Sequence, residues 1–382
     1  MFLQIHSLTS YHATLLNRDD AGLAKRIPFG DKPRLRISSQ CLKRHWRENL
    51  QDTVKLPQGI RSRQFFGRIV LPELIQAGVA ETLARVLAKA LIDAVIDGGV
   101  EDDGSLALKQ PVLFGRPEAD FFVGLLTECA TAGDEKAALD TLKQKLKTDK
   151  KNFKAMLKQA GHGDLYAGLE GAMFGRFVTS DILARSDAAV HVAHAFTVHG
   201  LDTEVDYFTV VDDLNLDDET GAAHAGDMEL GAGLYYGYVA VDIPLLISNL
   251  TGCDAKDWAK QDSADARQVL AGLIEAIATV SPGAKLGATA PYAYSDFLLL
   301  EAGAKQPRCL ANAYLKALPA KGDVMQSAVD AMGCYLADVD AMYGATAGHR
   351  AAATRKQWPE NAAPRLPLDQ AVKQILDAVF GA

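Results

Sequence analysis

Residues 15–47 read LLNRDDAGLAKRIPFGDKPRLRISSQCLKRHWR and form a basic island in an acidic chain. Residues 1–70 contain 13 Lys and Arg against 5 Asp and Glu, whereas the whole chain of 382 residues contains 40 against 48. Proteins that hold a phosphate backbone gather Lys and Arg locally, and their overall charge need not be positive. The segment therefore predicts a local polyanion-binding surface. Its cations are Arg18, Lys25, Arg26, Lys32, Arg34, Arg36, Lys43, Arg44 and Arg47.

The basic segment lies between an expected strand and an expected helix. Because side chains alternate along a strand, residues 2–10 would place Phe2, Gln4, His6 and Leu8 on one face and Leu3, Ile5 and Ser7 on the other. Residues 11–37 are rich in Gly, Pro and charge, which predicts a long loop. A loop of that length in a compact domain is usually functional or disordered.

A helix is expected from Ser38 onward, because a serine oxygen can cap the free backbone N–H groups of a first turn. Lys43 and Arg47 are four residues apart, so they share one face of this helix. Arg44 lies beside them, and Leu42 and Trp46 can pack inward.

Downstream patterns complete an α+β fold. Residues 72–171 look helical, with one long helix expected at 73–95 and another at 121–131. Strands are expected at 190–199, 233–243 and 295–301, and helices at 264–280, 324–342 and 368–379. The order strand, helix, strand, strand, helix, strand is the ferredoxin-like or RNA-recognition-motif-like plan. The helical block is then an insertion after the first helix, and residues 200–232 are a second insertion between the middle strands.

The helical insertion carries a lysine stripe at helical spacing. Such a stripe is commonly a solvated helix face, and contact with a polyanion is the alternative. Its members are Lys143, Lys147, Lys150, Lys151, Lys154 and Lys158.

The insertion at 200–232 is acidic and Gly-rich, which favours a protruding hairpin. Its aromatic pair Tyr207 and Phe208 can stack on an exposed base, a contact worth about 1–3 kcal/mol per base. Equally, Phe208 can anchor the hairpin to the body, and the sequence leaves both interpretations open.

No motif points to catalysis, a metal or a cofactor. The five cysteines are scattered and form no CxxC pair. His191 and His199 would face one side of a strand and His194 the other, so a shared metal is not expected and hydrogen-bonding roles are. Acid pairs occur at Asp19-Asp20, Asp102-Asp103, Asp212-Asp213 and Asp217-Asp218. They lack the spacing of a nuclease, and Asp19 and Asp20 are expected to order the basic loop. Phosphate-loop, nucleophile-elbow and dinucleotide motifs are missing.

Bulk properties predict a cytoplasmic globular protein with no membrane partner. The chain is 48% hydrophobic and 23% charged. No apolar run approaches the roughly 20 residues needed to cross a bilayer, and residues 1–10 lack the pattern of a signal peptide.

Several motifs together resemble one known family. They are LNRDD at 16–20, FGDKPRLRISSQCLKR at 29–44, GRFVTSD at 175–181, VAHAFTVH at 192–199, DYFTVVDDL at 206–214 and SPGAKLG at 281–287. In this order they resemble CasC (the Cas-seven family), the backbone subunits of the type I-E CRISPR Cascade complex. Pro33 departs from the pattern, since a basic residue is expected there.

The resemblance implies a hand-shaped, non-cleaving subunit. Its palm would comprise residues 1–58, 183–199 and 233–382, its helical fingers residues 59–182, and its β-hairpin thumb residues 200–232. About six copies would polymerise head to tail along a crRNA, because heterologous contacts generate open helices. Each thumb would displace one guide nucleotide and leave segments free to pair with target DNA. Other implied partners are the Cas-five, Cas-six, small and large Cascade subunits.

The resemblance also assigns guide contacts residue by residue. A guide of arbitrary sequence must be held by phosphate and sugar, since base contacts would restrict its code. Besides the basic-loop cations, the contacts implied are Ser38, Ser39, Gln40, Lys43, Arg44, Arg47, Arg176, Phe177, Thr179, Tyr207, Phe208 and Thr209. The lysine stripe would be a candidate contact to target DNA.

Two other functions compete with this one. Related type III backbone subunits are metal-dependent endoribonucleases that use a loop aspartate, and Asp19, Asp20 or Asp212 would be the candidate here. A small-molecule enzyme with a ferredoxin-like core is the third interpretation, and no motif supports it.

Overall fold

The structure is a computed structural model that describes residues 1–96, 98–101, 103–149, 167–176, 186–210 and 224–381. The chain forms two compact units. The first comprises 1–54, 191–241 and 267–382, and the second comprises 55–190 and 242–266. This division assigns 242–266 to the same unit as the expected fingers, whereas the sequence placed that stretch in the palm.

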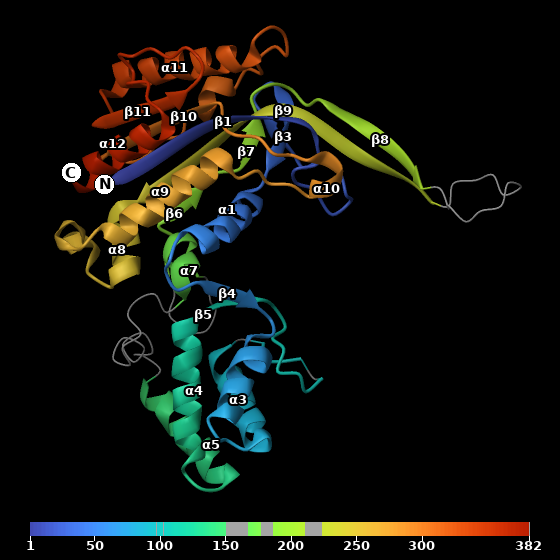
Figure 1. Ribbon diagram of the computed structural model, residues 1–382, viewed down its shortest axis with the longest axis vertical. Helices are drawn as coiled ribbons and strands as arrows, with labels where there is room; N and C mark the ends of the chain where they lie inside the picture. Colours follow the sequence, from blue (N-terminus) through green and yellow to red (C-terminus); the bar gives the residue numbers. More distant parts are fainter. Residues whose placement is uncertain (97, 102, 150–166, 177–185, 211–223, 382) are drawn as a thin grey trace, which may run out of the picture. The chain divides into compact units, whose positions relative to one another are not determined.

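The first unit is built on a nine-stranded sheet whose main path runs β11-β10-β1-β9-β7-β3-β2, with β6 and β8 also paired to β9 (Figure 1). Its strands are β1 (Phe2–Thr14), β2 (Arg26–Phe29), β3 (Lys32–Ile37), β6 (Val190–Val192), β7 (Ala195–Thr197), β8 (Thr203–Val210), β9 (His224–Asp242), β10 (Phe297–Gly303) and β11 (His349–Thr354). Its helices are α1 (Ser39–Thr53), α9 (Ala264–Thr279), α10 (Leu286–Thr289), α11 (Val324–Tyr343) and α12 (Leu368–Phe380), with a 3-10 turn at Ala311–Tyr314.

The central strands have the ferredoxin-like order, and the predicted α+β class is confirmed. Along the chain the elements run β1, α1, β7, β9, α9, β10, and in the sheet the strands lie as β10-β1-β9-β7. This is the order 4-1-3-2 of a βαββαβ unit. Strand β1 pairs antiparallel with β10 from Phe2↔Gly303 to Leu8↔Phe297.

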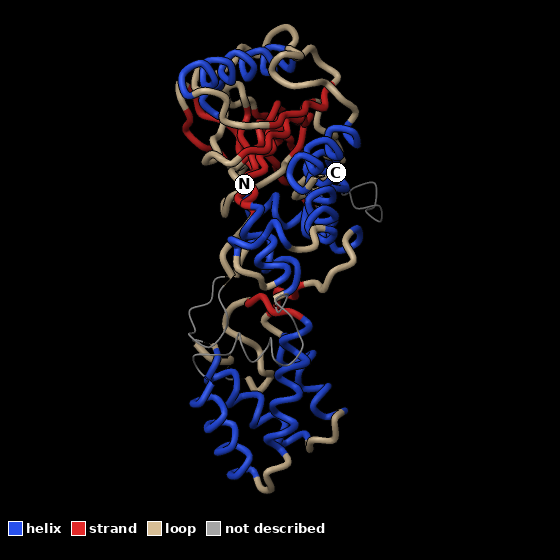
Figure 2. The backbone as a smooth tube through the Cα atoms, turned by 90° about the vertical axis from the view of Figure 1, so that its left-hand side faces the viewer, coloured by secondary structure: helices blue, strands red, loops and turns tan. Residues whose placement is uncertain are grey.

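Both faces of this sheet are covered, and Leu8 and Ser7 lie on opposite faces as the alternation in residues 2–10 predicts. Leu8 packs on one face in a cluster with Phe297, Met325 and Met332, so α11 covers that face (Figure 2). On the other face Tyr11 lines a cavity of about 30 Å³ together with Ser7, Leu42 and Trp46 of α1 and Ile277 of α9. The first unit is therefore a helix–sheet–helix arrangement.

The expectation of one long loop over residues 11–37 is wrong. Strand β1 continues to Thr14, and residues 26–37 form the hairpin β2–β3. An apolar contact holds this hairpin against the sheet, because the ring centres of Phe29 and Phe196 lie 4.6 Å apart. Strand β3 also pairs with β7 through Arg36↔Phe196 and Ile37↔Ala195. The expected strand at 190–199 is likewise divided into β6 and β7.

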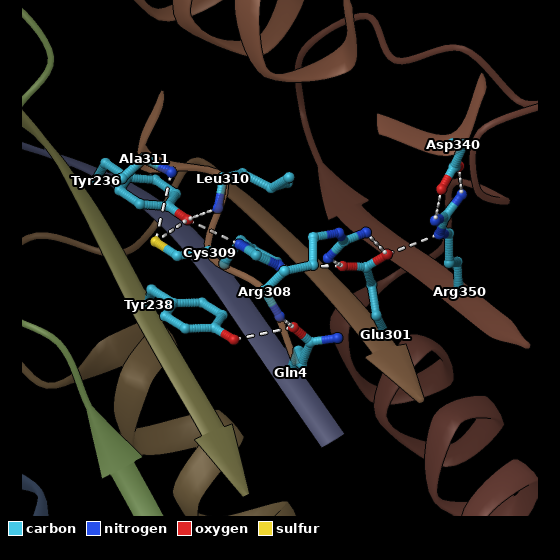
Figure 3. A network of polar contacts seen from close by, with 11 residues as sticks. Gln4, Tyr236, Tyr238, Glu301, Arg308, Cys309, Leu310, Ala311, Asp340 and Arg350 are labelled. Carbon is cyan, nitrogen blue, oxygen red and sulfur yellow. Dashed lines mark hydrogen bonds and ion pairs between the residues drawn. The ribbon is translucent and has the colours of Figure 1, made fainter. Parts of the chain in front are cut away.

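A buried polar network lies between β1, β10 and β11 (Figure 3). Glu301 is fully buried, and its carboxylate accepts hydrogen bonds of 2.6 and 2.8 Å from Arg308 and one of 2.7 Å from Arg350. His6 Nε2 lies 3.1 Å from Glu301, and His6 Nδ1 lies 2.9 Å from the hydroxyl of Tyr236. Burial opposes ionisation of Glu301, but the hydrogen bonds from Arg308 and His6 outweigh it and lower the pKa of this carboxyl.

The outer edge of β11 is occupied by main chain from the segment before α12. Ala352 donates its N–H to the carbonyl of Pro364 at 2.9 Å, and its own carbonyl accepts from Leu366 N–H at 2.8 Å. At the opposite end of the sheet, β2 carries an exposed proline, Pro28.

The second unit is mainly helical, as predicted. Its elements are β4 (Gly59–Ser62), a π-turn (Phe66–Val70), α2 (Leu71–Gln76), α3 (Glu81–Val95), β5 (Val112–Gly115), α4 (Arg116–Ala130), α5 (Glu135–Asp149), α7 (Gly168–Phe174), α8 (Ile243–Thr251) and a 3-10 turn (Ala255–Lys260). The one long helix expected at 73–95 is interrupted, because Gly78 adopts φ +92°, which ends α2. The two-stranded antiparallel sheet of β4 and β5 was also not expected.

Candidate nucleic-acid interface

The start of α1 is held in place from two directions. Ser38 caps the helix, since its Oγ accepts the Cys41 N–H at 3.3 Å. Asn17, from the LNRDD motif, accepts two N–H groups. Its side-chain Oδ1 accepts the Ser38 N–H at 2.9 Å, and its main-chain carbonyl accepts the Lys25 N–H at 2.9 Å. The predicted cap is confirmed, and Asn17 connects Lys25, which precedes β2, to the start of α1.

His194 accepts one of the free main-chain N–H groups in the first turn of α1. Its Nδ1 accepts the Ser39 N–H at 3.0 Å, so a neutral ring carries its proton on Nε2. Burial lowers the pKa of His194, and the charges of Arg36 and Lys25 lower it further. The predicted hydrogen-bonding role is confirmed. His199, which accepts the Leu234 N–H at 3.1 Å, has one too.

Three cations surround this helix start. Lys25 and Arg36 lie side by side, since the Arg36 N–H donates to the Lys25 carbonyl at 2.8 Å, and both charges lower the pKa of His194. Arg44 and Lys25 both oppose the rise that burial causes in the pKa of Cys41 on the first turn. Arg44 is well exposed and forms an i,i+4 pair of 2.9 Å with Glu48. The structure thus gathers Lys25, Arg36 and Arg44 in one place, together with the exposed Gln40.

The remaining predicted cations divide into exposed, half-buried and engaged groups. Arg18 and Lys32 are exposed, and Lys43 and Arg47 are half-buried. Burial lowers the pKa of Lys43. Arg26 is part-exposed and paired with Glu229 of β9.

Arg34 is the clear exception among the predicted contacts. Its side chain has 0% exposure. Its guanidinium donates to the carbonyls of Thr197 at 3.0 Å and Tyr314 at 2.9 Å, and it lies 3.5 Å from Asp31. A phosphate cannot reach a group that is buried and bonded in this way. The expectation that Arg34 contacts RNA is therefore corrected to a structural role. Ser38, another predicted RNA contact, is also buried, and its hydroxyl oxygen caps α1.

Asp19 orders the basic loop, as predicted. Its carboxylate accepts the N–H groups of Ala21 at 3.0 Å and Leu23 at 2.9 Å. Asp20 is exposed, and Asp212 lies outside the described residues. Among the residues that the structure does describe, no group of three His, Cys, Asp or Glu side chains could hold a metal ion.

The arm, which we define as β8 with the β9 residues His224–Gly231 that pair with it, projects from the sheet (Figure 1). Tyr207 is 68% exposed. Phe208 points to the opposite face, where it is half-buried across from Gly226 and has the Lys285 ammonium 5.9 Å from its ring centre. Thr209 is exposed. Of the two open interpretations, this geometry favours stacking for Tyr207 and anchoring for Phe208.

In the second unit, the predicted contact Arg176 is buried. Its guanidinium lies 2.7 Å from both carboxylate oxygens of Glu118 and 3.1 Å from the Leu113 carbonyl. The expectation that Arg176 faces RNA is thus corrected to a buried ion pair. Phe177 and Thr179 lie outside the described residues.

The lysine stripe begins on α5. Lys143 is exposed and lies 3.9 Å from Asp140. The structure describes the backbone of Lys147 but not its side chain, and it does not describe Lys150, Lys151, Lys154 and Lys158. Contact of this stripe with DNA stays a prediction. In the described part of the chain no helix is long and apolar enough to span a membrane.

Comparisons with known proteins identify a family and two similar folds. The sequence matches the family described as "CT1975-like protein" over residues 3–379. A chain of a "CRISPR RNA-guided surveillance complex, pre-nicking" has a similar fold, with a TM-score of 0.75 and 22% identity over 98% of this chain and 100% of that one. A chain of another "CRISPR RNA-guided surveillance complex" matches with a TM-score of 0.63 and 20% identity over 100% of both chains. A search of curated proteins finds no match.

Proposed function

Because this chain belongs to the CT1975-like family over nearly its whole length, we propose that it is the guide-RNA-binding backbone subunit of a type I-E Cascade surveillance complex. About six copies would follow one another head to tail along a crRNA, since heterologous contacts build open helices. They would present segments of the guide for pairing with target DNA in antiviral defence. The similarity of fold to chains of RNA-guided complexes supports this proposal.

The observation that carries the proposal is the group of cations around the start of α1. Lys25, Arg36 and Arg44 lie at a helix start in a chain whose net charge is −8. The positive end of the helix dipole also favours a phosphate at such a place. Neither the cations nor the dipole reads a base, which suits a protein that must accept any guide.

The proposed partners follow from the same assignment. They are crRNA, target DNA, further copies of this chain, and the Cas-five, Cas-six, small and large subunits. The complex would work in the cytoplasm. The protein would act as a scaffold, and another protein would cut the target.

Charge reversal of the three gathered cations tests the proposal. The variant Lys25→Glu/Arg36→Glu/Arg44→Glu is compared with Lys256→Glu/Lys260→Glu/Lys321→Glu, which changes the charge equally at exposed lysines elsewhere. Binding of single-stranded RNA is measured by anisotropy at several salt concentrations. Each lost phosphate contact lowers the slope of log affinity against log salt by about 0.7.

We expect the first variant to lose about 100-fold or more in affinity and to have a shallower salt slope. The control should bind nearly as the wild type does. Equal RNA binding by the two variants, with both folded by circular dichroism, would rule out this surface.

A further inference from the structure

The arm is a two-stranded ribbon, and such ribbons are only marginally stable in water. Eight register pairs join its strands, from Thr203↔Gly231 to Val210↔His224. Because side chains alternate along a strand, the pair Val205↔Glu229 lies on one face and Phe208↔Gly226 on the other. The direction of the arm therefore depends on what contacts each of its two faces.

On the first face, Glu229 joins the arm to the basic loop. This carboxylate is only 5% exposed. It accepts the Ala24 N–H at 2.8 Å and forms an ion pair with Arg26. Two residues further along, Gly231 rests against Leu35 of β3: a Cβ there would lie 2.6 Å from Leu35 Cδ1. This face thus rests on the same segment that carries the candidate RNA contacts.

On the second face, Phe208 joins the arm to the loop that contains SPGAKLG. Gly226 leaves room for the ring, since a Cβ there would lie 2.8 Å from Phe208 Cζ. The ammonium of Lys285 lies 5.9 Å from the ring centre, within the range of a cation–π contact. The loop of Lys285 is in turn fixed to the chain just after β1, because Ala284 donates its N–H to the Leu15 carbonyl at 3.0 Å.

We propose that Glu229 and Lys285 are positioning residues that hold the arm from its two faces and so determine where it crosses a bound RNA. The two contacts come from separate segments of the first unit. Each segment is tied to the core by main-chain or apolar contacts, so neither can shift without moving the arm. The part of this proposal that concerns RNA rests on the proposed function, and the part that concerns the arm does not.

The first experiment uses the full chain without RNA. Hydrogen exchange of residues 203–210 is measured for Glu229→Gln, Lys285→Met and the double variant. Controls are Glu360→Gln and Lys321→Met, which make the same chemical changes at exposed positions. We expect exchange in β8 to be about threefold faster in Lys285→Met and about tenfold faster in the double variant, with β1 and β10 unchanged. Lys285 is exposed, so its variant remains informative if Glu229→Gln misfolds.

The second experiment adds single-stranded RNA and maps its protection from hydroxyl radicals. We expect a periodic pattern with wild type and both controls, and loss of the period with the double variant. Exchange in β8 equal to the controls would overturn the proposal. Faster exchange with an unchanged RNA pattern would overturn the part that concerns RNA. If the wild type does not bind RNA, the proposed function and the RNA part of this proposal are both overturned. The exchange data would still decide whether Glu229 and Lys285 hold the arm.

Discussion

Arg34 donates a hydrogen bond of 2.9 Å from Nη2 to the main-chain oxygen of Tyr314, 280 residues later in the sequence. A second bond of 3.0 Å runs from Nη1 to the carbonyl of Thr197. A cation in the basic segment thus connects the β2–β3 hairpin to the body of the first unit. Its charge stabilises the fold, and it does not face the solvent.

Replacement of Arg34 should therefore reduce stability. Arg34→Met leaves two buried carbonyls without their donor, which we expect to lower the free energy of unfolding by about 2–4 kcal/mol. Urea denaturation measures this loss. Lys32→Met, at an exposed position on the same strand, is the control and should change stability by less than about 0.5 kcal/mol. If the two variants unfold at the same urea concentration, the structural role of Arg34 is wrong.

The buried network predicts a loss of stability in acid. Burial lowers the pKa of His6, so the unfolded chain takes up a proton at a higher pH than the folded one. Stability should fall as the pH drops below the ordinary imidazole value of about 6.5. It should fall again below the ordinary carboxyl range, because the pKa of Glu301 is also lowered. Denaturation at pH 7, 6 and 5 measures the first part.

His6→Gln separates this effect from general acid denaturation. It should be less stable than wild type at pH 7, but its stability should change less between pH 7 and 5. An equal loss over this range in the two proteins would show that His6 is not the group responsible.

The two aromatic residues of the arm should respond differently to truncation. Tyr207→Ala should weaken RNA binding by about 1–3 kcal/mol, since an exposed ring is available to stack on a base. It should leave hydrogen exchange in β8 unchanged. Phe208→Ala should instead speed that exchange, because its ring packs across from Gly226 and lies against the Lys285 ammonium. The reverse result for the pair would contradict the assignment.

The cap of α1 should contribute measurably to stability. Ser38→Ala removes the acceptor for the Cys41 N–H and should cost about 0.5–2 kcal/mol in thermal or urea unfolding. Ser39→Ala is the matched control, because the structure shows only a 3.4 Å side-chain contact, to the neighbouring Gln40, for its hydroxyl. Similar losses in the two variants would argue against the cap.

Asp19→Ala distinguishes the scaffold from the endoribonuclease. Loss of the two hydrogen bonds to Ala21 and Leu23 should loosen the loop and weaken RNA binding several-fold. Wild-type protein incubated with RNA and Mg²⁺ should leave the RNA intact. Periodic fragments that vanish in Asp19→Ala or Asp212→Ala would favour the enzyme.

Sequence patterns predicted the order of the core elements well, because alternation and helical periodicity report burial directly. They failed at the β2–β3 hairpin, where Pro28, Pro33 and the turn at Gly30 resemble an irregular loop. Composition also does not distinguish a buried cation from an exposed one. The burial of Arg34 depends on carbonyls from remote segments, which no local pattern reveals.

Likewise, the contacts of Glu229 were missed because it lies in an acidic, Gly-rich stretch whose composition predicted only a protruding hairpin. Its partner Arg26 is 203 residues earlier in the chain. A hydrogen-bonding role was predicted for His194, but its bond to the start of α1 needs the spatial pairing of β7 and β3. Contacts between residues so far apart in the sequence become visible only when the pairing of the strands is known.

The covering of β11 by residues 364–366 restricts how copies of this chain can associate. Unpaired strand edges allow sheets to continue from one molecule into the next, which is also the route to amyloid-like stacking. Here the main-chain groups of Ala352 are already satisfied from within, and Pro28 has no N–H to offer at the other margin. At these two margins of the sheet, contacts between copies are therefore expected to use side chains rather than shared main-chain hydrogen bonds.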